Sequence, residues 1–204
     1  MKIEKYEYTK KNKYNVYLDN GEVLTLYEKV ITEEELLLKK EIDKELYNKL
    51  LKRNTLYDSV DLAIKYIDIR LRSKLEIKNY LLKKEVEEDI IDEIIDILLK
   101  NNYLDDDKFT KALIKDKLAF TSMGDYKIKL ELQRYGVDSS IIEDNISLID
   151  DNLLEDKMKK TIEKDLRTNK KYSGTTLKNK IYNHLVSQGY SKSKVISIIN
   201  KYNF

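Results

Sequence analysis

The sequence predicts a mainly α-helical protein with a small antiparallel β-sheet at its amino terminus. Apolar and polar residues alternate through the first thirty positions, which indicates short strands. Beyond them apolar residues recur at helical spacing, and no proline interrupts the pattern. A pattern of about fifty residues then occurs three times, which is typical of tandem three-helix repeats that form an elongated, curved array.

The predicted strands lie within residues 1–31. Their apolar side chains form two or three alternating groups: Tyr6 and Tyr8, then Tyr14, Val16 and Leu18, then Val23, Leu24 and Leu26. Asn20-Gly21 separates the last two groups and is a strong hairpin-turn dipeptide. Because a small hairpin is only marginally stable alone, we expect this region to pack on another element.

Residues 32–57 are predicted to form a helical connector. Thr32 and Glu35 have the spacing of a capping box, in which the hydroxyl and the carboxylate each accept a backbone N–H of the other residue. A short helix should therefore begin at Thr32. Asp43 is expected to cap a second helix that continues through Leu46 and Leu50.

Three repeats are predicted, over residues 58–104, 105–151 and 152–204. Each should open with an amphipathic helix that has an acid in its first turn, at Asp58, Asp107 and Asp156. The second helices share apolar pairs four residues apart, namely Ile77 and Leu81, Ile128 and Leu132, and Ile181 and Leu185. Gly136 and Gly189 follow two of these helices, where a residue of positive φ can end a helix. Units this small cannot each bury a full core, so neighbours should share one.

Composition argues against most classes of enzyme. The chain has no cysteine and one histidine, His184, so thiolate sites and histidine metal clusters are excluded. Asp105-Asp106-Asp107 resembles a carboxylate cluster, but adjacent helical residues point apart and acids are favoured at a helix start. We therefore expect no catalysis, no cofactor and no metal.

Neither a membrane span nor a signal peptide is visible in the sequence. No stretch approaches the roughly 18 apolar residues that a span requires, and "MKIEKYEYTKK" lacks an apolar core. These features predict a cytoplasmic protein, for which a monomer is the simplest interpretation.

Charge is distributed unevenly along the chain. The net charge is +1 for residues 1–57, −3 for residues 58–104, −4 for residues 105–151 and +8 for residues 152–204. A basic segment of this kind attracts phosphate backbones or acidic protein surfaces. The alternative is a solvated helical face.

The strongest local motif is "RLRSKLEI", which starts at Arg70. Ser73 and Glu76 have the spacing of a capping box, which does not by itself account for Arg70 and Arg72. Their planar guanidinium groups suit paired contacts with carboxylate or phosphate. The alternative is an ion pair within the chain, for which the available acids are Asp58, Asp61 and Asp68.

Three segments resemble the RecX family of regulatory proteins. "AIKYIDIRLRSKLEIKNYLLKKEV" is similar to the first repeat of that family, "NNYLDDDKF" to the link that follows, and "MGDYKIKLELQRYGVDSSII" to the second repeat. The third repeat matches more loosely. Glu85 stands where the family usually has glycine, so we expect that helix to end differently or to run on.

The resemblance implies a regulator without catalytic activity. RecX proteins bind the RecA recombinase when it is polymerised on single-stranded DNA, and they usually inhibit its ATPase, strand-exchange and coprotease activities in DNA repair and the SOS response. A sign-segregated rod could lie in the groove of such a filament, with its acid-rich third helices outward. The expected contact residues are basic: Arg70, Arg72, Lys74, Lys78, Lys127, Arg134, Arg167, Lys170, Lys171, Lys178 and Lys180.

Direct DNA binding without RecA is the alternative function. Three-helix units can resemble helix-turn-helix modules, but no second helix carries the side chains that read base edges, so such binding would be independent of sequence. Tyrosines could stack on bases. We expect those near apolar faces to pack in the core instead, namely Tyr66, Tyr80, Tyr103, Tyr126 and Tyr190.

Overall fold

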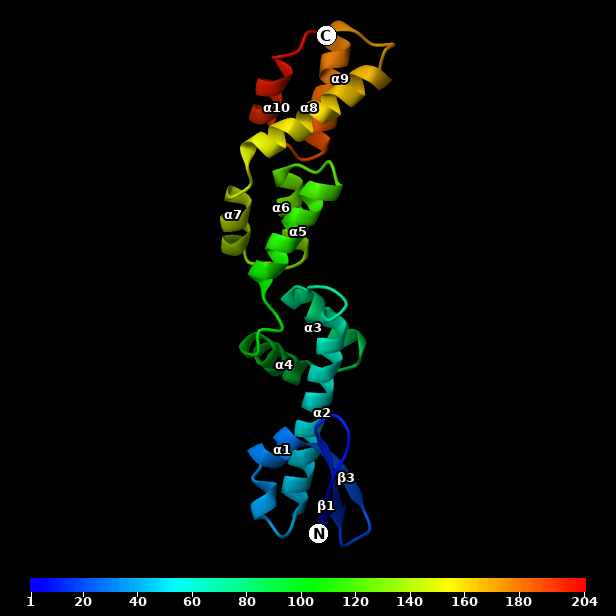
Figure 1. Cartoon of the computed structure of the whole chain (residues 1–204), viewed down its shortest axis with the longest axis vertical. Coiled ribbons are helices and arrows are strands. Elements are labelled where there is room, and N and C mark those ends of the chain that lie inside the picture. Colours follow the sequence, from blue (N-terminus) through cyan, green and yellow to red (C-terminus); the bar gives the residue numbers. More distant parts are fainter. The chain divides into compact units, whose positions relative to one another are not determined.

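The computed structural model describes residues 1–204, which form two compact units. The first unit contains residues 1–69 and 80–103, and the second contains residues 70–79 and 104–204. The prediction of a mainly α-helical fold with a small amino-terminal sheet is confirmed (Figure 1). No helix is both long enough and apolar enough to cross a bilayer.

The sheet has three strands, β1 (Ile3–Tyr8), β2 (Lys13–Leu18) and β3 (Val23–Tyr27), paired in that order and antiparallel. Val16 and Leu18 of β2 and Leu24 and Leu26 of β3 are buried on one face, as their alternation predicts. The predicted turn is confirmed, with Gly21 at a φ of +83° between β2 and β3. The sheet lies beside the helices that follow it (Figure 1).

The predicted capping box at Thr32 is wrong. Helix α1 (Glu28–Glu33) begins directly after β3, with Tyr27 as its N-cap, and the backbone N–H of Tyr27 donates to the Asn54 side chain at 3.0 Å. Thr32 therefore lies inside α1, and its hydroxyl donates to the Glu28 carbonyl. A short 3₁₀ helix, η1 (Leu36–Leu38), follows and places Leu36 in the core.

Helix α2 (Lys44–Ile67) is continuous from the predicted connector into the predicted first repeat. Asp43 caps it as expected, with its carboxylate accepting the Leu46 N–H at 2.7 Å. Asp58 therefore lies in the middle of a helix and not in a first turn. The Tyr27 hydroxyl lies 2.9 Å from Asp58 and 2.7 Å from Asp61, which joins the sheet to α2.

Helices α3 (Lys74–Lys83) and α4 (Glu88–Lys100) follow α2. Arg53 and Lys52 of α2 form ion pairs with acids of α4, and the ring of Tyr66 stacks on that of Tyr80 with 4.0 Å between centroids. The apolar positions that define the repeat are buried here, namely Ile77, Leu81, Ile91, Ile94 and Leu98.

The second unit contains two further helix triplets. The first consists of α5 (Asp106–Phe120), α6 (Asp125–Arg134) and α7 (Ser139–Ser147), and the second of α8 (Asp151–Thr168), α9 (Gly174–Ser187) and α10 (Lys192–Ile199). The predicted pairs Ile128 and Leu132, and Ile181 and Leu185, are fully buried. Leu118 and Ile149 pack against the apolar clusters of both triplets, so neighbouring triplets share apolar contacts as predicted.

Helix α8 begins earlier than the repeat pattern predicts. Its first-turn acid is Asp151, capped by Asp150, and Asp156 lies further along. Lys157 reaches back from α8 to the carboxyl end of α5, where its ammonium donates to the carbonyls of Leu118 and Thr121 at 2.5 and 2.6 Å. Burial lowers the pKa of Lys157, and so does the nearby charge of Lys160.

All three second helices end in the same way, which corrects the prediction for Glu85. Glu85, Gly136 and Gly189 have φ values of +61°, +70° and +91°. The next residue in each case donates its N–H to a carbonyl five positions back, as in Val86 to Leu81 at 3.1 Å. This is the Schellman arrangement, and glutamate replaces glycine in it at a cost in backbone strain.

Candidate partner-binding surfaces

The predicted capping box at the start of α3 is confirmed. The Ser73 hydroxyl accepts the Glu76 N–H, and the Glu76 carboxylate accepts the Ser73 N–H, both at 3.2 Å. The same carboxylate binds Arg70 at 2.5 Å and Arg72 at 3.4 Å. The two arginines are therefore drawn into the cap itself, a role that the sequence interpretation missed. Arg72 is buried, whereas Arg70 is exposed.

The three carboxylates that open α5 have separate roles. Asp105 caps the helix by accepting the N–H groups of Asp107 and Lys108. Asp106 is buried and accepts the N–H of Lys74 at 3.0 Å, and this burial raises its pKa. Asp107 binds Lys111 and the Asn145 amide. Both contacts lower its pKa, and the contact with Lys111 has the larger effect. These acids are structural and do not converge on one point.

Helix α3 is joined to the helix triplet that follows it through its first turn. Besides the contact between Lys74 and Asp106, Leu75 packs on the bare Cα of Gly136, where α6 ends. A Cβ added at Gly136 would lie 2.9 Å from the Leu75 side chain. Glycine is therefore required here by contact as well as by φ.

Helix α6 is joined to the last triplet in the same manner. The N–H of Gly124 donates to the Gln188 carbonyl at 2.9 Å, and that of Tyr126 to the Gly189 carbonyl at 3.1 Å. A Cβ on Gly189 would lie 2.3 Å from the Cβ of Lys127 and 2.6 Å from its backbone nitrogen. The first turn of one second helix thus rests on the end of the next.

The last triplet carries a run of bases without acidic partners, which we call the third-repeat basic set. All of its members are exposed and none forms an ion pair: Lys160, Lys164, Arg167, Lys170, Lys171, Lys178, Lys180 and Lys192. Neighbouring bases outside the set are neutralised, since Lys159 binds Asp156 and Glu155 at 3.3 and 3.2 Å and Lys201 binds Glu155 at 3.0 Å. Uncompensated positive charge is thereby concentrated on this triplet.

Two members of the set flank one aromatic ring. The ammonium groups of Lys171 and Lys180 lie 5.2 and 4.5 Å from the ring centroid of Tyr172. Lys178 instead binds the Asn200 side chain at 3.0 Å, so it is oriented toward the end of α10. Lys178 is therefore held by Asn200, whereas Lys171 and Lys180 share the ring of Tyr172.

The remaining predicted bases lie on other elements. Lys74 and Lys78 are on α3, where Lys74 lies 4.0 Å from Asp106. Lys127 and Arg134 are exposed and seven residues apart on α6, hence on one face. The Lys127 ammonium is 3.4 Å from the Ser187 carbonyl at the end of α9.

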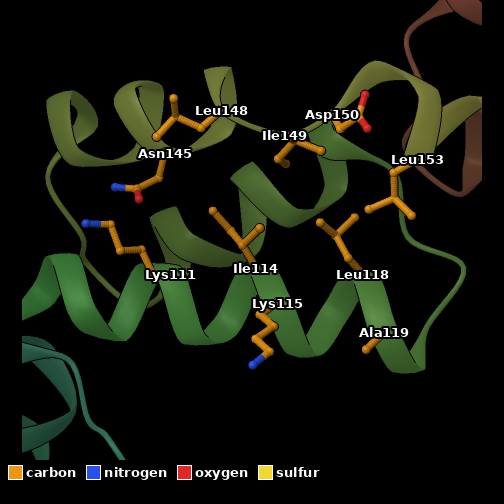
Figure 2. A pocket seen from close by; sticks show the side chains of 10 residues that line it. All are labelled: Lys111, Ile114, Lys115, Leu118, Ala119, Asn145, Leu148, Ile149, Asp150 and Leu153. Carbon is orange, nitrogen blue, oxygen red and sulfur yellow. The ribbon is translucent and has the colours of Figure 1, made fainter.

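An apolar groove of about 480 Å³ lies between α5, α7 and the start of α8 (Figure 2). Ile114, Leu118 and Ile149 line its centre, and Leu148 is largely exposed beside it. Lys111 and Asn145 face one another at one end, where both bind Asp107 (Figure 2). The groove therefore offers apolar contact and no free polar group at that end.

The predicted burial of tyrosines holds for only part of the set. Tyr190 is buried, and burial raises its pKa to about 12. Tyr66 and Tyr80 are half-buried as a stacked pair, but Tyr103 and Tyr126 are exposed, so their predicted packing is wrong. Both lie at helix ends, where fewer neighbours surround a side chain. Phe120, 84% exposed at the end of α5, was missed by the sequence interpretation.

Tandem helix triplets define this protein as a helical-repeat protein. The family model described as RecX, first three-helix domain, matches residues 60–98, and that of RecX, second three-helix domain, matches residues 105–144. The chain belongs to the RecX family of regulatory proteins.

Curated relatives extend the similarity over most of the chain. Regulatory protein RecX of Oceanobacillus iheyensis is 31% identical over 194 residues, which cover 93% of this chain and 71% of the relative. Regulatory protein RecX of Finegoldia magna is 32% identical over 198 residues, with coverages of 94% and 95%. The family resemblance inferred from the sequence is thereby confirmed.

Solved structures share the fold. A crystal structure of regulatory protein RecX superposes with a TM-score of 0.89 at 22% identity, covering 98% of this chain and 99% of that chain. RecX from Lactobacillus salivarius gives a TM-score of 0.68 at 27% identity, with coverages of 72% and 95%.

Proposed function

We propose that the protein binds the RecA recombinase filament on single-stranded DNA and inhibits its activities. Membership of a family of regulatory proteins supports a regulatory role. The observation that carries the filament assignment is the third-repeat basic set, whose exposed charges have no acidic partner within the chain. A nucleoprotein filament presents phosphates at regular intervals, and several weak contacts to it would add through multivalency.

Inhibition would follow from occupancy of the filament. The three carboxylates that open α5 hold backbone and side-chain groups of the chain itself, so these acids are used within the fold. A bound protein that contacts several recombinase subunits would oppose nucleotide turnover and strand exchange. It would act by occupying the surface on which these steps depend.

RecA ATP hydrolysis on single-stranded DNA tests the proposal. Increasing amounts of the protein should lower the hydrolysis rate, and a Lys171→Ala/Lys180→Ala variant should need a higher concentration for the same effect. The matched control is Lys159→Ala/Lys201→Ala, which removes equal charge from bases already neutralised by Glu155 and Asp156. Unchanged hydrolysis with the unaltered protein contradicts the assignment.

Direct DNA binding without RecA is a second candidate. The observation that favours it is Tyr172 between Lys171 and Lys180, since an aromatic ring beside cations suits single-stranded nucleic acid. Fluorescence anisotropy on bare and on recombinase-coated DNA distinguishes the two. Tight binding to bare DNA that weakens steeply with salt supports this candidate, whereas binding only to coated DNA supports the first.

A further inference from the structure

The two joints of the second unit share one construction. In each, the first turn of a second helix rests on the residue of positive φ that ends the second helix of the following triplet. Leu75 lies on Gly136 in one joint and Lys127 lies on Gly189 in the other. Backbone N–H groups near the helix start donate across both joints, from Lys74 to the Asp106 carboxylate in one and from Gly124 and Tyr126 to backbone carbonyls in the other.

Glu85 is the equivalent residue at the end of α3, and no helix start of this chain lies on it. It has the same positive φ and the same Schellman hydrogen bonds as Gly136 and Gly189. In the two joints, the helix start comes from the preceding helix triplet. The first repeat is preceded by residues 1–57, which form the sheet, α1, η1 and the first part of α2 and contain no such triplet. At this position the first unit has an open groove of about 620 Å³, which we call the first-repeat groove.

The first-repeat groove has an apolar floor and an acidic edge. Leu62, Val86 and Ile90 provide apolar surface between α2 and the start of α4. Glu85 and Glu87 are exposed on the edge and form no ion pair.

The other charges on the edge are largely neutralised. Asp58 binds Lys13 at 2.7 Å and Lys52 binds Asp89 at 3.0 Å, which leaves Lys84 as the opposing base. The edge is therefore negative overall and favours a basic occupant.

The joint between α3 and α6 indicates which chemistry fits. Glu87 corresponds to Asp138, which follows Gly136 by two residues as Glu87 follows Glu85. Ser140 lowers the pKa of Asp138, and so does the more distant charge of Lys74. In that joint Lys74, whose ammonium lies 4.0 Å from Asp106, directly precedes Leu75, whose side chain lies on Gly136.

We propose that the first-repeat groove receives the amino-terminal turn of a helix from a partner protein, one that carries a basic residue followed by an apolar residue. The apolar side chain would lie against Val86 and Ile90, and the base near Glu87. The N–H groups of the helix start would donate to carbonyls at the end of α3, as Tyr126 does to Gly189.

A second copy of the chain fits less well as the occupant. The starts of α3 and α6 are already engaged in the joints described above. Helix α9 is about one turn longer at its start than α6, when Ile181 of α9 is aligned with Ile128 of α6. The start of α9 therefore presents a different surface from the helix starts that form the two joints. This inference concerns a protein partner in general, and it does not require the proposed function.

The test uses the full chain, labelled with ¹⁵N, and a synthetic peptide with the sequence of residues 70–83. That peptide contains the helix start that the chain itself places on Gly136. We expect its addition to shift the amide resonances of residues 84–90 and of the facing residues of α2. A control peptide with Lys74→Glu and Leu75→Asp should bind at least tenfold more weakly.

Variants of the protein complete the test. Glu85→Gln/Glu87→Gln should weaken peptide binding severalfold and Glu85→Lys/Glu87→Lys at least tenfold. Asp92→Lys/Asp96→Lys is the matched control, because both residues are exposed on α4 outside the groove. Circular dichroism verifies that each variant is folded.

Three outcomes of the peptide measurements overturn the proposal. They are the absence of shifts at millimolar peptide, shifts that map outside the groove, and equal binding by the charge-reversed and control variants. Self-association of the unaltered protein that is abolished by Glu85→Lys/Glu87→Lys would assign the groove to a second copy instead.

Discussion

Leu75 packs directly on the bare Cα of Gly136, so the start of one helix is seated on the end of the next. Lys127 likewise lies on Gly189, in this case through its backbone and Cβ. Each contact requires a residue that combines positive φ with the absence of a side chain. Glu85 has the positive φ but carries a side chain. The cost of the strained backbone and the cost of the contact can therefore be measured at different positions of the same protein.

Gly189→Ala is expected to lower the free energy of unfolding by about 3 kcal/mol, because a left-handed alanine is strained and its Cβ meets Lys127. Urea denaturation measures the change. Gly174→Ala is the matched control, since Gly174 also has a positive φ but has open space around it. Gly174→Ala should lower the free energy of unfolding by about 1 kcal/mol. Equal losses for the two variants would contradict an added cost from the contact with Lys127.

Glu85→Gly is expected to stabilise the protein by about 1 kcal/mol. Glycine adopts the left-handed conformation of residue 85 without strain, which stabilises the folded state. The greater conformational entropy of glycine in the unfolded chain offsets part of this stabilisation. Thermal unfolding followed by circular dichroism should show a higher midpoint. A lower midpoint would mean that the glutamate side chain contributes stability that its exposed position does not suggest.

Glu76→Gln is expected to cost on the order of 2 kcal/mol, since it removes the charge that binds Arg70 and Arg72 and weakens the cap on Ser73. Glu143→Gln is the control, because its ion pair with Lys129 is exposed. That change should stay within about 0.5 kcal/mol. A similar small effect at Glu76 would show that the cap is held by Ser73 alone.

Asp106 should make stability depend on pH in the acidic range. Its pKa is raised by burial, so the stability it contributes is fully present below the ordinary value of 3.8 and is lost as pH rises through the folded value. The unaltered protein should therefore lose stability relative to Asp106→Asn between pH 4 and pH 7. Urea denaturation of both proteins across this range measures the difference, and the opposite trend would contradict the direction of the shift.

Lys171→Ala/Lys180→Ala should reduce the salt dependence of nucleic-acid binding. If each lysine neutralises one phosphate of a single strand, the slope of log K against log salt falls by about 1.4. Lys159→Ala/Lys201→Ala should leave the slope nearly unchanged, because both bases are paired with Glu155. Anisotropy titrations at several salt concentrations give the slopes, and equal slopes for the two variants would exclude the Tyr172 region from phosphate contact.

Local chemistry made some features predictable from the sequence. The capping box at Ser73 depends on residues three positions apart, and the buried pair Ile77 and Leu81 on helical periodicity. The false box at Thr32 has the same local pattern. There the helix begins earlier, at Glu28, and its N-cap Tyr27 is held by Asn54, which is distant in sequence.

Other features depend on tertiary contacts or on rare conformations. The helix end at Glu85 was mispredicted because left-handed glutamate is uncommon, and glycine is the usual signal. Glu76 was assigned to the cap alone, although its carboxylate can accept several hydrogen bonds and so also holds both arginines. The predicted contact residues and the five-segment division of the chain stay predictions.

The continuous helix α2 has a consequence for how the first unit melts. Its opening turns bear Leu50 against the sheet, and its closing turns bear Ala63 and Ile67 in the buried part of the first repeat. Because one helix contributes buried residues to both regions, unfolding of α2 exposes apolar surface in both. The strands and the first repeat should therefore lose structure in one cooperative transition.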